Sequence, residues 1–240
     1  MANKFFVSPA PHVHSDYSTA RLMGDVVIAL LPALMVSVRV FGWNVLAITA
    51  VSIASCVLLE FLVQKYLVKG PVTVNNLSAV VTGLLLAMTL PATVPCWQAA
   101  IGSAFAIIIV KALCGGLGQN IFNPALAARA FMMLVWPASM VRYAALGVDG
   151  VTAATPLHHM VMPALPEETL LDMFLGNCPG SIGEISALAL LIGGAYLVIR
   201  KVISVRIPVA YLGTVAVLTL IFYKTDYPVR WMLYSLLSGG

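Results

Sequence analysis

The chain has 240 residues, of which 61% are hydrophobic and only 9% are charged, and its mean hydropathy is +0.99. Soluble domains carry roughly 25% charged residues, so this composition excludes an ordinary soluble domain and predicts an all-α, polytopic integral membrane protein. The net charge of +4 is not gathered into a Lys/Arg stripe with interleaved aromatic residues, so we expect no nucleic-acid partner.

The N-terminal segment lacks the features of a cleaved signal. It contains no apolar core followed by a small-residue cleavage site, and Pro9, Pro11 and Asp16 interrupt it. We therefore expect residues 1–21 to form a retained cytoplasmic arm.

Apolar blocks of about 20 residues, each long enough to cross a bilayer, occupy most of the remaining chain. About eight spans are predicted, some of them broken at Gly or Pro, with about five in a first bundle over 22–142 and the others in a second bundle over 183–240. They are placed near residues 22–41, 44–64, 77–94, 97–114, 126–142, 183–199 and 207–223, with the last beginning near Arg230.

Basic residues predict the orientation of these spans. With the N-terminus inside, the cytoplasmic segments hold most of the Lys and Arg residues, as the positive-inside rule requires. The long loop 143–182, which contains Asp149 and Asp172, is then extracytoplasmic.

Three polar or glycine-rich islands interrupt the apolar pattern, and the third is the long loop 143–182. Pro91 and Pro95 stand late in a span, where each removes a backbone donor, so we expect either a broken helix that lines a site or an ordinary kinked end. In "GGLGQNIFNPALAARA", Gly118 lets a ligand approach the backbone, and the amides of Asn120 and Asn123 suit a flat heteroaromatic ring. A tight turn capped by asparagines is the alternative. A water channel is disfavoured because the chain has one Asn-Pro-Ala box where aquaporins use two.

Ionisable residues within spans are functional candidates because their desolvation is expensive. Glu60 is the stronger candidate for an ion pathway, and Asp25 is a weaker one that could simply lie at the membrane interface. Glu184 is expected to open the sixth span. The four cysteines show no paired short spacing, and we predict no metal site made by this chain alone.

Four motifs, in this order and spacing, carry a resemblance to a known family: "NLSAVVTGLLLAMTLP", "GGLGQNIFNPALAARA", "DGVTAATPL" and "GSIGEISALALLIGG". The chain resembles the D subunits of Rnf complexes, which are ion-translocating ferredoxin:NAD oxidoreductases, and the homologous B subunits of the sodium-pumping NADH:quinone oxidoreductase. The resemblance implies about ten spans in the complete protein. Ile185 departs from it, since the family tends to have threonine there.

The resemblance implies a covalent cofactor. In this family the last threonine of a Ser/Thr-x-x-Thr motif carries FMN through a phosphoester, attached by a separate flavin transferase. The motif falls on Thr152–Thr155, so Thr155 is the expected attachment residue, with Asp149, Gly150 and Thr152 in the recognition motif. The residues alone would favour a plain small-residue loop, because a threonine hydroxyl is a weak nucleophile and no local base is visible.

The resemblance also implies a function. The chain would relay electrons between ferredoxin and NAD in a prokaryotic inner membrane, coupled to movement of Na+ or H+, beside other subunits that include a second flavin-bearing one. A noncovalent riboflavin or similar flavin is expected at Gly118, Asn120 and Asn123. The ferredoxin and NAD sites are expected on other subunits, since no nucleotide-binding strand and turn is present. A transporter or channel without redox chemistry, or a structural scaffold, is the competing hypothesis.

Overall fold

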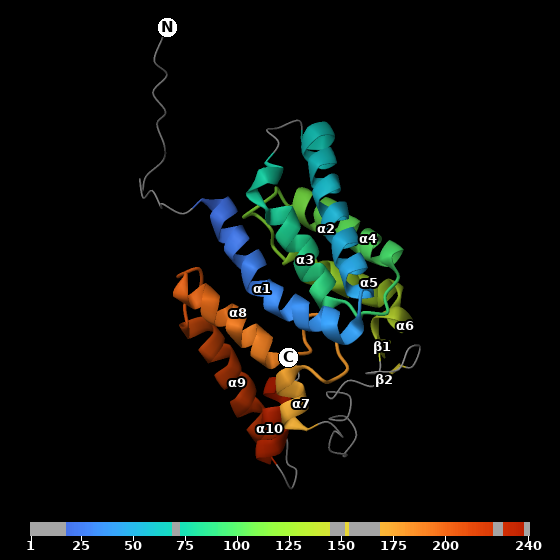
Figure 1. Ribbon diagram of the computed structural model, residues 1–240. Helices are drawn as coiled ribbons and strands as arrows, with labels where there is room; N and C mark the ends of the chain where they lie inside the picture. The colour runs from blue at the N-terminus through green and yellow to red at the C-terminus, as the bar shows by residue number, and fades with distance from the viewer. Residues whose placement is uncertain (1–17, 69–72, 145–151, 154–168, 223–227, 238–240) are drawn as a thin grey trace.

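The computed structural model describes residues 18–68, 73–144, 152–153, 169–222 and 228–237, and helices make up nearly all of this structure (Figure 1). The predicted all-α class is confirmed. The elements are α1 (Thr19–Phe41), α2 (Asn44–Leu62), the π-helix η1 (Val63–Val68), the 3-10 turn η2 (Val74–Asn76), α3 (Ser78–Thr89), α4 (Cys96–Ala104), the π-helix η3 (Phe105–Ala112), α5 (Pro124–Val135), α6 (Pro137–Met140), β1 (Tyr143–Ala144), β2 (Thr152–Ala153), α7 (Leu170–Leu175), α8 (Ala187–Ile199), α9 (Arg206–Phe222) and α10 (Pro228–Leu237).

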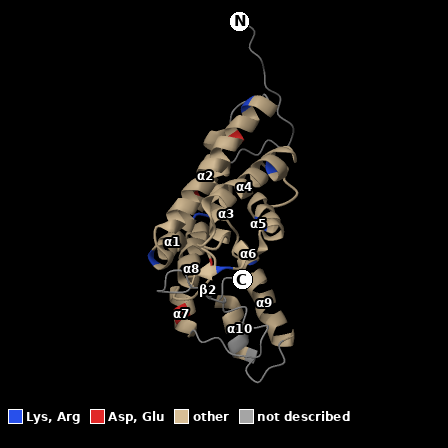
Figure 2. Ribbon diagram, turned by 90° about the vertical axis from the view of Figure 1, so that its right-hand side faces the viewer, with Lys and Arg blue, Asp and Glu red and all other residues tan. Residues whose placement is uncertain are grey.

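The exterior of the helices fits a membrane protein. By length and composition, Thr19–Phe41 and Asn44–Leu67 could each cross a membrane, and five shorter apolar helices of 10–17 residues accompany them. Large apolar side chains such as Leu134 and Phe222 are exposed, and Figure 2 shows that most of the helical ribbon is neither Lys or Arg nor Asp or Glu. A bilayer is the environment that covers exposed apolar surface of this extent.

One predicted span, 77–94, ends early and another, 126–142, is divided, and both changes occur at prolines. Helix α3 ends at Thr89, and helical backbone resumes only at Cys96, after Pro91 and Pro95. The predicted span 126–142 is likewise divided, because α5 ends at Val135 and α6 begins at Pro137. Proline lacks the N–H that a continuous helix needs at these positions.

The break after α3 is held by a second irregular segment that precedes α8. The backbone N–H groups of Ile182 and Gly183 donate to the carbonyls of Leu90 and Met88, and the Ser37 hydroxyl donates to the carbonyl of Ile182. Non-helical backbone inside a membrane protein is stable only when protein or water satisfies it. Here each break supplies hydrogen-bond partners to the other.

The prediction for Glu184 is wrong. Helix α8 begins at Ala187, and its N-cap is Ser186, whose hydroxyl accepts from the N–H of Ala189. Glu184 lies before the helix and pairs with Arg129 of α5 at 3.4 Å. The segment from Ser181 to Ser186 is irregular because Gly183 packs against Met88, which pairs this stretch with α3 instead of extending α8.

The polar ends of the bundle lie far apart. Figures 1 and 2 both show the C-terminal part of α2 toward one end, and β2 and α7 toward the other. This arrangement agrees with helices that alternate in direction. The assignment of the two ends to cytoplasm and exterior stays a prediction.

Close contact between α2 and α3 organises the core. Ile48 and Leu86 are fully buried in the largest apolar cluster, and the two helices approach each other at Gly83. A Cβ on Gly83 would lie 2.7 Å from the Cα of Ile53 and 2.8 Å from the carbonyl oxygen of Ser52. Because these atoms are backbone, a side chain at position 83 would force the helices apart.

Gly83→Ala should therefore destabilise the protein, by about 1–3 kcal/mol as for other overpacked positions. Gly194→Ala is the matched control, because a Cβ at Gly194 in α8 meets nothing within 4 Å and alanine favours helix by about 1 kcal/mol. Thermal unfolding in detergent should show a lower Tm for the first variant and an unchanged or higher Tm for the second. Equal Tm values would contradict the close approach of α2 and α3.

Candidate functional site

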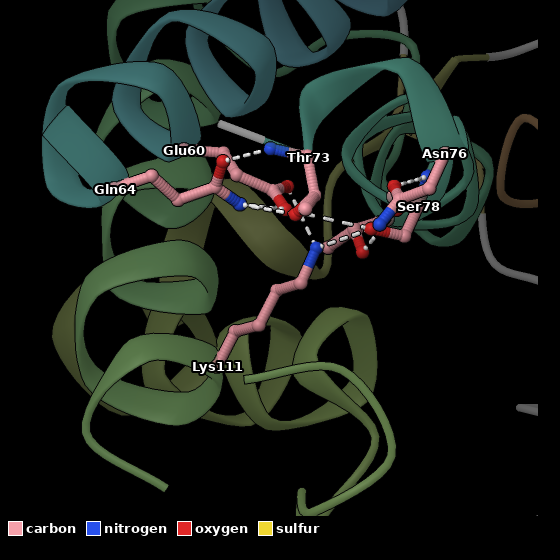
Figure 3. A network of polar contacts seen from close by, with 7 residues as sticks. Glu60, Gln64, Thr73, Asn76, Ser78 and Lys111 are labelled. Carbon is pink, nitrogen blue, oxygen red and sulfur yellow. Dashed lines mark hydrogen bonds and ion pairs between the residues drawn. The ribbon is translucent and has the colours of Figure 1, made fainter. Parts of the chain in front are cut away.

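A buried ion pair joins three helices near the end of the bundle where α2 meets α3. Lys111 Nζ lies 2.6 Å from Glu60 Oε2 and 2.7 Å from Ser78 Oγ. The side chains of Lys111 and Glu60 are only 6% and 5% exposed. Figure 3 shows Lys111 reaching from its helix toward Glu60 and Ser78.

Each of the three residues is placed by a local departure from regular helix. Ser78 starts α3 directly after Leu77, which has a left-handed backbone with φ of 62°, and its N–H donates to Asn76 Oδ1 at 2.9 Å. Lys111 belongs to the π-helix η3, and Glu60 lies just before the π-helix η1. Wide turns of this kind often occur at functional sites.

Further polar groups surround the carboxylate. Gln64 Nε2 donates to Glu60 Oε1 at 3.1 Å and to Thr73 Oγ1 at 3.1 Å, while Gln64 Oε1 accepts from the N–H of Thr73. Ser78 Oγ also lies 3.5 Å from Glu60 Oε1. Both carboxylate oxygens of Glu60 are therefore engaged.

Two cavities flank Lys111. The first has a volume of about 350 Å³ and is lined by Ser78, Lys111 and the glycine-rich loop, including Gly118, Asn120 and Asn123. The second has a volume of about 540 Å³ and is lined by Glu60, Gln64, Thr73 and Lys111, among others. Lys111 thus connects the predicted ion-pathway residue with the predicted flavin loop, which are far apart in the sequence.

The glycine-rich loop has the open backbone that its sequence predicts. Gly115, Gly116 and Gly118 all have positive φ, between 86° and 99°, a region where side chains are strained. Asn120 Oδ1 is buried and finds no hydrogen-bond partner among the described residues. Asn123 acts as the N-cap of α5, accepting from the N–H of Ala125 at 3.0 Å, so the asparagine-cap alternative is correct for this residue.

Asp25, the weaker ion-pathway candidate, lies in a different contact network. It is 4% exposed and accepts hydrogen bonds from Tyr196 Oη at 3.0 Å and from Arg200 Nε at 3.3 Å. These contacts fasten the start of α1 to the end of α8. Asp25 shares none of the hydrogen bonds described for Glu60.

Thr152, the first residue of the Thr-x-x-Thr motif, lies toward the opposite end of the bundle (Figure 1). Strand β2 pairs antiparallel with β1, with Thr152 opposite Ala144 and Ala153 opposite Tyr143. Asp149, Gly150 and Thr155 lie outside the described residues. The first position of the Thr-x-x-Thr motif is thus placed next to the chain that leaves α6.

A capping box at Thr169 and Asp172 stabilises the start of α7, in the C-terminal part of the loop 143–182. The Thr169 hydroxyl accepts from the N–H of Asp172, and the N–H of Thr169 donates to the Asp172 carboxylate. The hydrogen bond from the Thr169 hydroxyl lowers the pKa of Asp172. Met173 of α7 packs with Cys178 and with Tyr234 of α10, which fixes the short helix to the bundle.

The described residues offer no ready metal centre. Within those ranges no three His, Cys, Asp or Glu side chains gather into a group that could hold a metal ion. The four cysteines, all of which the structure describes, form no disulfide with one another.

Comparison with known proteins identifies the family. Residues 6–240 match the family described as NQR2, RnfD, RnfE. The chain belongs to the NQR2/RnfD/RnfE family. In Acetobacterium woodii, the D subunit of the Na+-translocating ferredoxin:NAD+ oxidoreductase complex is 51% identical to it over 240 residues, covering 98% of this chain and 73% of the relative.

Two further relatives of this NQR2/RnfD/RnfE chain have related names. In Clostridium ljungdahlii, the D subunit of the proton-translocating ferredoxin:NAD+ oxidoreductase complex is 43% identical over 237 residues, covering 93% of this chain and 71% of the relative. In Rhodobacter capsulatus, the D subunit of the ion-translocating oxidoreductase complex is 35% identical over 246 residues, covering 88% of this chain and 68% of the relative. The names of the first two relatives specify different ions, Na+ and the proton. Sequence identity of 51% or 43% therefore does not indicate which ion is moved.

Reasoning from sequence missed two members of the buried site, Lys111 and Ser78. Lys111 was counted only among the basic residues that indicate orientation, although a lysine in the middle of "IIIVKALCGG" is itself an ionisable group next to an apolar span. Such a residue is expected to have a partner. The opposite charges of Glu60 and Lys111 were the sequence signal by which the two residues could have been matched as partners.

Breaking the Glu60–Lys111 pair should lower the free energy of unfolding, while removing both charges should lower it much less. Glu60→Gln leaves a buried ammonium without its counter-ion, and we expect a loss of about 3–5 kcal/mol. Glu60→Gln combined with Lys111→Met removes both charges and should restore most of that stability. Unfolding of the purified protein in detergent measures both variants.

Glu184→Gln is the control, because the Arg129–Glu184 pair is 26% and 33% exposed and such pairs contribute about 0–1 kcal/mol. If Glu60→Gln costs no more than Glu184→Gln, Glu60 and Lys111 do not form a buried charged pair.

Proposed function

We propose that this chain is the D-type membrane subunit of an ion-translocating ferredoxin:NAD oxidoreductase complex and relays electrons through an FMN bound covalently to Thr155. Family membership and the names of relatives at 51% and 43% identity support the assignment to such a complex. The ferredoxin and NAD sites would lie on other subunits. The ion would be Na+ or H+.

The position of the Thr-x-x-Thr motif supports the attachment site. Pairing of Thr152 with Ala144 anchors the start of the motif to the end of the α5–α6 unit, and Thr155 follows three residues later in the chain. A threonine hydroxyl needs an activating base, and a separate flavin transferase would supply it. Such an enzyme requires an accessible peptide, and the residues around the two threonines are small: Gly150, Ala153 and Ala154.

The first cavity supports a second, noncovalent flavin such as riboflavin. Asn120 Oδ1 is a buried acceptor that lacks a partner within the described structure, and a ring N–H could donate to it. The left-handed backbone at Gly118 leaves open space where a side chain would stand. A cavity of about 350 Å³ lies at the small end of the range for ligand sites, about 300–1,000 Å³. A bound flavin supplies one- or two-electron transfer, and the protein positions and tunes it.

The two sites would lie at opposite ends of one subunit. By the distribution of Lys and Arg, the first cavity would face the cytoplasm and the Thr155 loop would face the exterior of a prokaryotic inner membrane. Electrons would pass across the membrane through this chain to or from neighbouring subunits, among them a second flavin-bearing subunit.

The covalent site is tested by in-gel fluorescence. When the protein is coexpressed with its flavin transferase, the wild-type band should fluoresce under ultraviolet light after denaturing electrophoresis, because a phosphoester survives denaturation. Thr155→Val should lose at least nine-tenths of this signal, since valine has no hydroxyl. Thr152→Val should retain fluorescence, and Thr214→Val, in α9, is the matched control.

A bright band in Thr155→Val would overturn the attachment site. A dark wild-type band would favour the competing function, a transporter or channel without redox chemistry.

The noncovalent site is tested by flavin extraction. Asn120→Ala removes the buried acceptor, so flavin released by acid from the purified complex should fall at least fivefold, while fluorescence of the covalent band stays unchanged. Asn177→Ala, at an exposed asparagine near α7, should change neither quantity. Equal release from both variants would place the second flavin elsewhere or exclude it.

A further inference from the structure

The Glu60–Lys111 pair presents different charges to the two cavities beside it. Among the described residues, Lys111 and Ser78 line the first cavity and Glu60 does not, whereas Glu60 and Lys111 both line the second cavity. Of the two charged partners, only the positive one therefore borders the first cavity. A ligand in that cavity would contact the ammonium without contacting the carboxylate that balances it.

Lys111 is held firmly and still has a hydrogen atom to donate. An ammonium group has three N–H donors. Within the described part of the chain, Glu60 Oε2 accepts one of them at 2.6 Å and Ser78 Oγ accepts another at 2.7 Å. The Lys111 side chain is only 6% exposed, and charges interact more strongly in such surroundings than in water. Lys111 is thus a fixed, buried positive charge with one donor left for a ligand.

The first cavity combines this cation with an acceptor. Asn120 lines the cavity, and its buried Oδ1 has no partner among the residues that the structure describes. One edge of a flavin ring carries an N–H between two carbonyl oxygens, and uptake of one electron without a proton gives the neutral ring one negative charge. Asn120 Oδ1 can accept from the N–H, and Lys111 can donate to a carbonyl oxygen. A buried positive group favours a negative charge beside it, so Lys111 distinguishes the reduced ring from the oxidised one.

We propose that Lys111 raises the reduction potential of the noncovalent flavin in the first cavity, and that Glu60 and Ser78 are positioning residues that hold its ammonium there. This inference rests on the second flavin of the proposed function. The electron comes from one redox partner of the complex and passes to the next, and no proton is needed in this step. Because binding and reduction are linked, tighter binding of the reduced ring by Lys111 is the same quantity as a higher potential. Charge close to the ring is one of the means by which a protein tunes a flavin.

Redox titration of the purified complex, followed by flavin absorbance, tests this role. The transition that is missing in Asn120→Ala is assigned to the noncovalent flavin. Lys111→Met removes the positive charge and leaves the Glu60 carboxylate, so the preference for the reduced ring should fall at least tenfold, which lowers the one-electron potential by about 59 mV or more. Lys111→Arg keeps the charge and should keep most of the potential.

A double variant separates electrostatic tuning from a structural role. Glu60→Gln with Lys111→Met removes both charges and so protects folding, and its potential should lie between those of the wild type and Lys111→Met, since no carboxylate charge remains. A purely structural role of the pair predicts one potential for every variant that retains the flavin. Lys65→Met, at an exposed lysine of η1, should titrate as the wild type does.

Two results would overturn the proposal, and they differ from each other. If the noncovalent flavin is present and its potential is the same in the wild type, Lys111→Met and the double variant, Lys111 does not tune it, while the second flavin itself stands. If acid releases no flavin from the wild-type complex, the second flavin and this role of Lys111 fail together.

Discussion

A carboxylate and an ammonium that are buried among apolar helices must remain paired, because either one alone would be a buried charge without a counter-ion. This requirement joins the helices that form the candidate site. Glu60 on α2 and Lys111 on η3 are 51 residues apart in the chain, yet their charged atoms lie 2.6 Å from each other. The hydroxyl of Ser78 at the start of α3 completes the contact. Three helices are therefore joined at one end by the two contacts of Lys111, and a cavity lies on either side of this residue.

At the opposite end of the bundle, backbone hydrogen bonds join two irregular segments, one of which also pairs Glu184 with Arg129. The prolines after α3 interrupt the helix, and the irregular chain before α8 supplies donors to the carbonyls that this break leaves open. The β1–β2 pairing then holds the start of the Thr-x-x-Thr motif next to the end of α6. The bundle thus separates the buried Glu60–Lys111 pair at one end from Thr152, the first residue of that motif, at the other.

The sequence predicted the helices well because apolar blocks and prolines act locally. The predicted spans 22–41 and 207–223 differ from α1 and α9 by at most three residues at either end. The exact start of α8 was missed by four residues, because Gly183 packs against Met88, a contact between segments that are distant in the chain. Glu184 consequently serves as a partner for Arg129 and has no role in opening the helix.

By itself, the sequence determined the membrane class, the family and the motif in which Thr155 stands, because composition and short motifs are properties of neighbouring residues. It also marked Glu60 and the loop containing Asn120 as separate candidates. Only the tertiary structure decided that these two candidates share Lys111, that Asp25 is instead committed to Tyr196 and Arg200, and that Asn123 is a helix cap. The physical reason is that the partner of a buried charge is chosen by the packing of whole helices, which no local pattern records.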